Sequence, residues 1–354
     1  MITWWPNGRH MICPGVIGGS DMRRIAVVTS GGDAPGMNAC VRAVVRKALY
    51  HGLEVVGVRR GFHGLVAGDF AEMKSRTVGD ILQRGGTILK SARSEEFRTE
   101  EGRAKALLQL RTYEIDGVIG IGGDGTHAGL DLLSKMGMPT VGIPATIDND
   151  IGSTDSAIGF DTACNTVIDA INKIRDTATS HERTYVVEVM GRNSGHIALA
   201  AGLAGGAESI LIPEVEFDIQ QVCERITAGA RQGKSHSIVV VAEGAEGAVS
   251  PSKGGLPGGC AYRIGQQIAE LTGFETRIIV LGHIQRGGAP SVRDRILATT
   301  LGAKAVDVLL SGLGSGVVGV LGNEIRVMSF AEALSMKRMI NMDYYELANI
   351  LSNL

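Results

Sequence analysis

Residues 25–52 read IAVVTSGGDAPGMNACVRAVVRKALYHG, and this stretch decides the fold. Its first part, Ile25–Thr29, is a continuous apolar run of the kind found in parallel strands that are buried on both faces. After a glycine-rich turn, apolar residues recur at helical spacing from Val41 to Leu49, and Gly52 supplies a C-terminal stop. The stretch therefore predicts a strand, a tight turn and a helix.

The same order repeats along the chain, because segments of helix length separate further strand-like runs. A second helix with one apolar face is expected around residues 165–176. This pattern predicts an α/β fold with two doubly wound, Rossmann-like, three-layer αβα domains, mostly parallel sheets and right-handed crossovers. Ligands then bind at the carboxyl ends of the strands. The other runs are Val55–Val58, Gly117–Ile121, Thr140–Ile143, Tyr185–Val189, Ser209–Ile212, Ser237–Val241 and Arg277–Leu281.

Length and composition are those of a globular protein of more than one domain. The chain has 354 residues, of which 44% are apolar, and its 50 glycines are scattered rather than periodic, which excludes a collagen-like repeat. A formal net charge of −2 provides no basic excess, so neither nucleic acid nor a membrane surface is an expected partner. A small anionic ligand would need a local cluster of cations.

The five cysteines show no CxxC spacing, which disfavours a disulfide framework or a zinc site and favours a reducing, cytoplasmic location. The apolar run Ile197–Ala207 is too short to span a bilayer. Residues 1–21 lack the apolar stretch of a signal peptide. We expect residues 1–21 to be a disordered appendage and the fold to begin at Met22.

Three motifs place glycine-rich turns beside carboxylates: Gly-Gly-Asp (31–33), Gly-Gly-Asp-Gly-Thr (122–126) and Thr-Ile-Asp-Asn-Asp (146–150). Glycine lets backbone amides approach phosphate, and aspartates hold magnesium or accept a proton. Together the motifs predict a phosphoryl-transfer site. Singly, each has a plainer interpretation as a tight turn or an Asx-rich turn.

Six motifs follow one another along the chain: TSGGDAPGMN (29–38), SAR (91–93), IGGDG (121–125), TIDND (146–150), VMGR (189–192) and GHIQRGG (282–288). By these motifs the chain, from about Met22 to the C-terminus, resembles the bacterial ATP-dependent 6-phosphofructokinases. A GGDGT loop alone also occurs in NAD kinases and diacylglycerol kinases, so the order of all six carries the resemblance.

The resemblance implies phosphorylation of fructose 6-phosphate at its 1-hydroxyl in glycolysis, with ATP as donor. It also implies a larger ATP-binding domain, residues 22–159 with about 285–335, and a smaller fructose 6-phosphate domain, residues 160–284 with about 336–354.

For the nucleotide, the resemblance implies that Asp124 holds Mg²⁺ and that Arg93 bridges the transferring phosphates. Gly125 matches the ATP users, whereas pyrophosphate users have a second aspartate there. Pyrophosphate users also have lysine where this chain has Ala145, and typical ATP users have glycine. ATP is therefore the expected donor. The implied nucleotide contacts are Gly31, Gly32, Arg93, Gly123, Asp124, Gly125 and Thr126.

For the chemistry, Asp148 is the expected base that takes the proton of the sugar hydroxyl. By the same resemblance, Thr146 orients the γ-phosphate, Asp150 assists the base or the metal, and Arg192 stabilises the transition state.

For the sugar phosphate, several cations must surround a dianion. In the family, Arg183 and Arg277 reach across from a neighbouring subunit, so the resemblance implies a homotetramer. Besides Thr146, Asp148 and Asp150, the implied substrate contacts are Arg183, Met190, Gly191, Arg192, Glu243, Arg277, His283 and Arg286.

Arg42 and Arg46 lie four residues apart and form one cationic face of the first helix, which by itself is an ordinary solvated surface. The resemblance implies that they bind ADP or phosphoenolpyruvate at a subunit interface. Around Asp69 an expected arginine is replaced, which puts a negative charge near that anion. The other implied effector contacts are Arg175, Glu208, Arg231, Lys234 and His236.

Two questions stay open in the sequence. The Gly/Pro-rich segment 246–259 is either an inert surface excursion or a flap near the sugar site. Three other functions compete with the ATP-dependent enzyme: a pyrophosphate-dependent enzyme, a NAD kinase-like enzyme and a silent nucleotide sensor. Gly125 opposes the first, the 282–288 motif opposes the second and Asp148 opposes the third.

Overall fold

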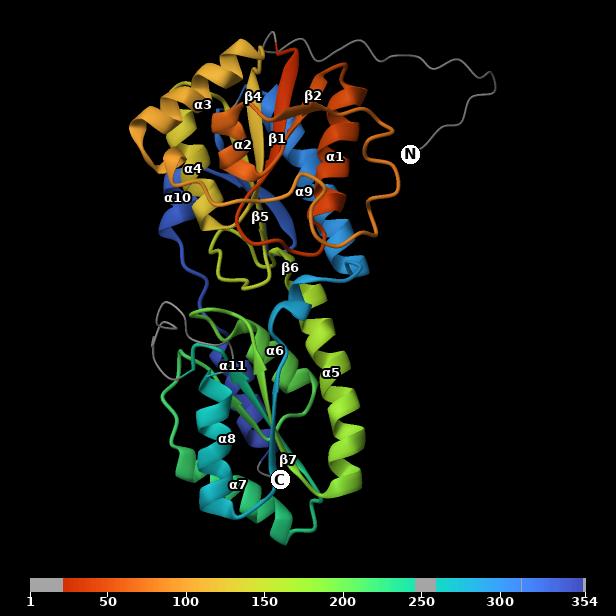
Figure 1. Ribbon diagram of the computed structural model, residues 1–354, viewed down its shortest axis with the longest axis vertical. Coiled ribbons are helices and arrows are strands. Elements are labelled where there is room, and N and C mark those ends of the chain that lie inside the picture. The colour runs from red at the N-terminus through yellow and green to blue at the C-terminus, as the bar shows by residue number, and fades with distance from the viewer. Residues whose placement is uncertain (1–21, 246–258, 313, 353–354) are drawn as a thin grey trace, which may run out of the picture.

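The computed structural model describes residues 22–245, 259–312 and 314–352. These residues form two lobes, each built on its own sheet with helices on both faces (Figure 1). The expectations about residues 1–21, and about the segment 246–259 apart from Gly259, lie outside the described residues.

The upper lobe is built on a sheet with the strand order β12-β11-β5-β4-β1-β2-β3, and β6 pairs with the end of β5. Its inner strands are parallel, whereas β3 and β12 run antiparallel at the two edges. The strands are β1 Arg24–Thr29, β2 Glu54–Val58, β3 Phe70–Glu72, β4 Gly117–Gly122, β5 Thr140–Thr146, β6 Ile158–Gly159, β11 Gly316–Leu321 and β12 Glu324–Met328.

Helices cover this sheet because successive residues of its strands face opposite sides. Val27 of β1 packs in a cluster with α1 and α9, and the next residue, Val28, packs with α2, α3, α4 and α10. The upper lobe is therefore a three-layer sandwich. Its helices are α1 Met37–Tyr50, α2 Gly61–Ala67, α3 Glu100–Thr112, α4 Asp124–Lys135, α9 Val292–Leu310 and α10 Phe330–Ser335, with a 3₁₀ turn, η1, at Glu96–Arg98.

The lower lobe contains an entirely parallel sheet with the order β10-β7-β9-β8. Helices α5 and α6 lie on one face, and α7 and α8 on the other. Its strands are β7 Thr184–Val189, β8 Ser209–Leu211, β9 Ser237–Ala242 and β10 Thr276–Val280. Its helices are α5 Phe160–His181, α6 His196–Ala204, α7 Ile219–Arg231, α8 Gly259–Thr272 and α11 Met342–Ser352, with a 3₁₀ turn, η2, at Gly282–Arg286.

The expected fold class is confirmed, and each of the eight strand-like runs coincides with a strand. The second expected helix is longer than 165–176, because α5 begins directly after Gly159, whose φ is 107°, and continues to His181. The antiparallel strands β3 and β12 were not predicted, and neither were β6 and the inner strand β11.

The chain crosses between the lobes three times, from β6 to α5, from η2 to α9 and from α10 to α11 (Figure 1). The buried Asp294 of α9 joins two of these crossings, since its carboxylate accepts hydrogen bonds from the amides of Gly159 and Thr162 at the start of α5. No helix within the described residues is both long and apolar enough to cross a membrane.

Candidate active site

The three carboxylate-bearing motifs meet at one edge of the upper sheet. They follow β1, β4 and β5, which are adjacent and parallel, so their carboxyl ends lie side by side. This edge faces the lower lobe (Figure 1). The expectation that ligands bind at carboxyl ends of strands thus corresponds to the interlobe region.

The first two motifs leave space beside exposed backbone. Gly31 has a φ of 84°, which favours glycine, and a methyl group on Gly123 or Gly125 would meet no heavy atom within 4 Å. Asp124 begins the twelve-residue helix α4, whose free amides favour an anion. The buried Thr126 Oγ1 has no hydrogen-bond partner among the described residues. These groups fit a phosphate chain.

Asp124 and Asp150 are close enough to influence each other. Burial raises the pKa of Asp124, and the charge of Asp150 raises it further. Such a pair favours a cation between the carboxylates. Mg²⁺ is usually held by one or two carboxylates while phosphate oxygens and water complete its shell, so these residues fit a magnesium ion that arrives with a nucleotide.

Asp148 is the most enclosed carboxylate of the third motif, with 3% of its surface exposed. Its Oδ2 lies 3.6 Å from Arg192 Nε, and its buried Oδ1 has no hydrogen-bond partner among the described residues. Burial raises the pKa of Asp148, the charge of Arg286 lowers it, and that of Asp150 raises it. The result is an enclosed carboxylate with one oxygen near Arg192 and one without a partner among the described residues.

Arg192 is held in place by its backbone. Its amide and that of Gly191 donate to Glu243 Oε1 at 2.7 and 3.2 Å. Gly191 has a φ of 144°, and a Cβ there would lie 2.4 Å from the carbonyl oxygen of Ser194. Glycine is therefore required at this turn, and Glu243 uses one carboxylate oxygen for the backbone while the other stays available.

Arg286 connects the motif at residues 282–288, named here the sugar-phosphate motif, to the Gly-Gly-Asp motif at residues 31–33. It is 8% exposed, and its Nη1 donates to the carbonyl oxygen of Asp33 at 3.0 Å. A Cβ on Gly32 would lie 2.7 Å from the same nitrogen, so glycine makes room for the guanidinium. His283, three residues earlier on η2, is exposed.

The family model named Phosphofructokinase matches residues 24–309. The chain belongs to the phosphofructokinase family. The resemblance drawn from the six motifs is thereby confirmed.

Several curated relatives are more than 50% identical in sequence to this chain. It is 57% identical over 332 residues to the ATP-dependent 6-phosphofructokinase of Halothermothrix orenii, which covers 94% of this chain and 100% of the relative. Identity to the enzyme of the same name from Brevibacillus brevis is 55% over 331 residues, with 94% and 100% coverage.

Solved phosphofructokinase structures agree with the fold. The Saccharomyces cerevisiae phosphofructokinase superimposes with a TM-score of 0.79 at 35% identity, over 94% of this chain and 47% of that chain. A pyrophosphate-dependent phosphofructokinase from Marinobacter aquaeolei gives a TM-score of 0.80 at 22% identity, over 91% of this chain and 86% of that one. At that identity the second likeness shows the fold alone.

Not all of the expected phosphofructokinase substrate residues come together. Arg183 directly precedes β7 and Arg277 lies at the start of β10, whereas Met190 and Glu243 follow the carboxyl ends of β7 and β9. About five residues of strand, roughly 17 Å, separate the two groups. Both arginines pair with Glu275, and Arg183 Nε lies 2.8 Å from its Oε2.

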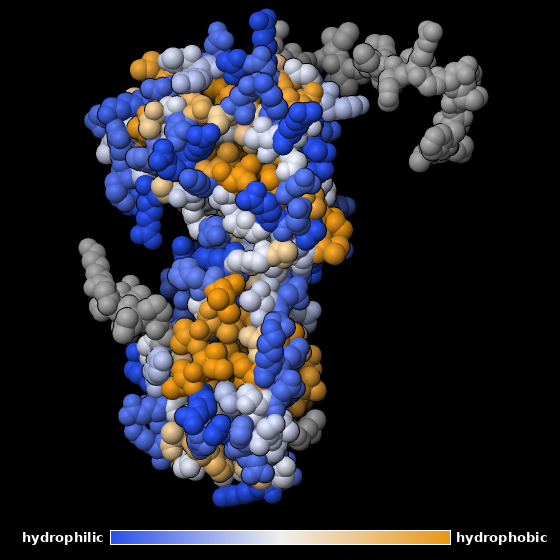
Figure 2. Space-filling model, turned by 45° about the vertical axis from the view of Figure 1, so that its right-hand side comes forward, coloured by the Kyte–Doolittle hydropathy of each residue, from blue (hydrophilic) through white to orange (hydrophobic). Residues whose placement is uncertain are grey.

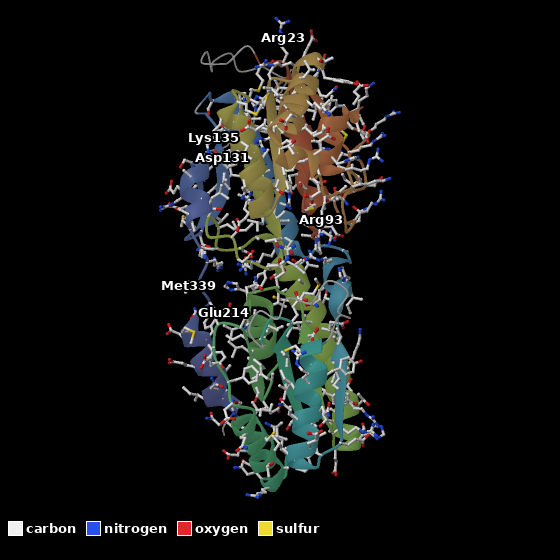
Figure 3. All side chains as sticks on the ribbon, turned by 60° about the vertical axis from the view of Figure 1, so that its left-hand side comes forward. Arg23, Arg93, Asp131, Lys135, Glu214 and Met339 are labelled. Carbon is white, nitrogen blue, oxygen red and sulfur yellow. The ribbon has the colours of Figure 1, made fainter. Side chains whose placement is uncertain are left out.

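Arg93, the last residue of the SAR motif (91–93), is exposed and makes no hydrogen bond or ion pair within the described part of the chain. Figure 3 places it at the lower edge of the upper lobe, beside the lower lobe. Its guanidinium has no partner among the described residues that would fix it, so only the start of its side chain is placed by the backbone.

The expected effector residues form two groups on different lobes. Arg42 is half-buried and Arg46 exposed on α1 of the upper lobe. In the lower lobe, Lys234 Nζ lies 2.9 Å from Glu208, and Arg175 Nη1 lies 3.4 Å from His236 Nε2.

The remaining effector candidate, Arg231, is exposed on α7 of the lower lobe. Asp69, where an arginine was expected, is neutralised by Arg60 at 2.6 Å.

Sequence reasoning missed several residues that hold the site together. Ser194 Oγ donates to the carbonyl oxygen of Asp148 at 3.0 Å, and Asn149 accepts from the amide of Ala157 at 2.9 Å. The fully buried Gln285 accepts from the amide of Met190 at 3.3 Å. Ser194, Asn149 and Gln285 lie within or beside the quoted motifs, which was the available signal.

Proposed function

We propose that this chain phosphorylates the 1-hydroxyl of fructose 6-phosphate with ATP, yielding fructose 1,6-bisphosphate and ADP, the glycolytic reaction of an ATP-dependent 6-phosphofructokinase. The observation that carries the proposal is the enclosed Asp148, which has one oxygen beside Arg192 and one without a partner among the described residues. A general base needs such an oxygen within reach of the hydroxyl proton.

In this reaction Asp148 accepts the hydroxyl proton as the sugar oxygen attacks the γ-phosphorus and ADP leaves. Arg192, which lies beside Asp148, and Arg93 balance charge on the transferring group. Thr146 is hydrogen-bonded to the amide of Asp148 at 3.2 Å and orients the phosphoryl group beside it. Magnesium held by Asp124, with Asp150 beside it, screens the phosphate charge when nucleotide is bound.

ATP is the proposed donor for a steric reason. The open space around Gly125 accommodates an α-phosphate, which an aspartate side chain there would fill. Ala145 is 1% exposed in β5 and adds only one methyl group to the wall of the site. The two curated relatives described above are ATP-dependent enzymes by name.

We further propose a cytoplasmic homotetramer whose active sites are completed across a subunit interface. The placement of Arg183 and Arg277 far from their own chain's Asp148 supports it, since two expected substrate ligands otherwise have no role. Figure 2 shows hydrophobic residues gathered on one face of the lower lobe. Separately, β10 is an edge strand of the lower sheet. ADP or phosphoenolpyruvate would bind where the two effector groups meet.

A coupled assay with fructose 6-phosphate tests the proposal by comparing ATP with pyrophosphate, each with and without ADP. Turnover with ATP, and little with pyrophosphate, is expected. Equal or faster turnover with pyrophosphate would identify the pyrophosphate-dependent enzyme instead. Nucleotide binding without any turnover would identify a silent nucleotide sensor.

A further inference from the structure

Asn38 is the last residue of the TSGGDAPGMN motif (29–38), and its side-chain amide is hydrogen-bonded to a loop that lies far along the chain. It lies in the first turn of α1 and is 1% exposed. Its Nδ2 donates to the carbonyl oxygens of Arg84 and Gly85, both at 3.1 Å. Its Oδ1 accepts from the amide of Ile88 at 2.8 Å. Both N–H donors and the oxygen of the amide are therefore engaged by one segment.

That segment, residues 84–93, ends at Arg93 and is named here the Arg93 segment. Thr29, at the end of β1, bonds to Thr87 Oγ1 at 2.9 Å and donates to the carbonyl oxygen of Lys90 at 3.0 Å. Ser91 Oγ donates to the carbonyl oxygen of Gly31 at 2.6 Å. Asn38 fixes the beginning of the Arg93 segment, and these bonds continue from it toward Arg93.

The Arg93 segment also touches the sugar-phosphate motif. A Cβ on Gly85 would lie 2.4 Å from the carbonyl oxygen of Gly288, two residues beyond Arg286. Gly85 is one of the residues that Asn38 holds, so a shift of this turn would reach both the nucleotide side and the sugar side of the site.

We propose that Asn38 is a positioning residue for phosphoryl transfer, which sets the location of Arg93 through the backbone of residues 84–93. The inference rests on the proposed function, because it takes Arg93 as a ligand of the transferring phosphates. Arg93 is exposed and has no side-chain partner within the described residues, so within this chain only its backbone determines where its side chain begins and which region the guanidinium can reach. A displacement of about 1 Å in such a group lowers turnover strongly, by up to about 100-fold.

The test is a double-mutant cycle between Asn38→Asp and Arg93→Ala, measured as kcat/KM for ATP. Asn38→Asp keeps the shape and the acceptor for Ile88 but removes both donors and faces the carbonyl oxygens of Arg84 and Gly85 with an oxygen. Alone, it should lower kcat/KM about 10–100-fold. In the Arg93→Ala background, Asn38→Asp should lower kcat/KM by less than about threefold further, because the guanidinium that Asn38 positions is absent.

Thr140→Val is the matched control for lost stability. Thr140 is buried at the start of β5, remote from the carboxyl end of the sheet, and its Oγ1 donates to the carbonyl oxygen of Leu130 at 3.0 Å. Its loss removes a buried hydrogen bond without touching the Arg93 segment, so its small effect should be the same with and without Arg93.

Each outcome decides the inference. An equal loss from Asn38→Asp in both backgrounds would overturn it and reduce Asn38 to a structural role. Full activity of Arg93→Ala alone would remove Arg93 from the proposed mechanism and the inference with it. If Asn38→Asp does not fold, the same cycle is run with Asn38→Ala, which adds no charge and suits a helix.

Discussion

Both ends of the lower-lobe sheet carry arginine and glutamate side chains, but these side chains make different contacts at the two ends. At the carboxyl ends of β7 and β9, Glu243 holds the amides of Gly191 and Arg192, and Arg192 meets Asp148. At the amino ends, Arg183 and Arg277 share Glu275 in an exposed ion-pair cluster. The first end is an assembled site, whereas the second is a group of cations balanced by a single carboxylate.

This difference shows what one chain builds by itself. Asp148 and Arg192 are positioned by hydrogen bonds and an ion pair within the chain. The arginines at the amino ends face away from that site, and exposed ion pairs contribute little stability, so Glu275 releases them readily to another anion. The predictions below test whether the two ends have these separate roles.

The largest effect is expected at the assembled end. Asp148→Asn keeps the shape but removes the base, so kcat should fall about 10²–10⁴-fold while the KM for both substrates changes little. Steady-state kinetics measure both. Asp307→Asn, which removes an exposed carboxylate paired with Lys47, is the matched control and should be nearly neutral. A near-normal kcat for Asp148→Asn would remove Asp148 from the role of base.

A smaller effect, of a different kind, is expected at the amino end. Arg277→Ala should raise the KM for fructose 6-phosphate about 10–100-fold, the value of one or two charge-assisted hydrogen bonds, and leave kcat largely intact. Arg326→Ala is the control, because Arg326 also pairs with a glutamate two residues earlier, on the distant strand β12. If the two variants behave alike, Arg277 has no part in sugar-phosphate binding.

The acid limb of the pH profile of kcat tests how burial and the neighbouring charges change the pKa of Asp148. Burial raises the pKa of Asp148, so activity should decline on acidification at a higher pH than an ordinary carboxyl group would give. The positive charge of Arg286 lowers that pKa, so Arg286→Gln should move the acid limb of kcat further toward neutral pH. An unmoved or oppositely moved limb would show that another group controls it.

The smallest effect is expected at the unpartnered hydroxyl of Thr126. Thr126→Val should leave the melting temperature unchanged, because the hydroxyl has no partner to lose among the residues that the structure describes. The KM for ATP should rise about 2–10-fold if a phosphate oxygen is its partner. Lower stability with an unchanged KM would place the hydroxyl's partner inside the protein instead.

Sequence patterns found most of the fold because its inner strands are buried on both faces. Continuous apolar runs such as Ile25–Thr29 are distinctive for that reason. Neither strand of the antiparallel β11–β12 hairpin was predicted, although Gly322 and Asn323 between them both have positive φ, as a two-residue hairpin turn requires. The Gly-Asn dipeptide was the available signal.

The motifs contain or adjoin the residues that hold the site, but they did not reveal what those residues do. Asn38, Ser194 and Gln285 each bond to backbone atoms at least 46 positions away in the chain. Such bonds depend on the tertiary fold, so the local sequence shows the residue but not its partner. For the same reason, the distance between Arg277 and Asp148 within one chain became visible only in three dimensions.

The separate roles of the two ends are tested most directly in mixed oligomers of Asp148→Asn and Arg277→Ala chains, assayed at low fructose 6-phosphate, where neither parent turns over well. If Arg277 acts on a neighbouring subunit, one of the two sites across a hybrid interface has both an intact Asp148 and an intact Arg277. The account predicts that isolated hybrids regain activity well above either parent. Activity no higher than the mean of the two parents would contradict it.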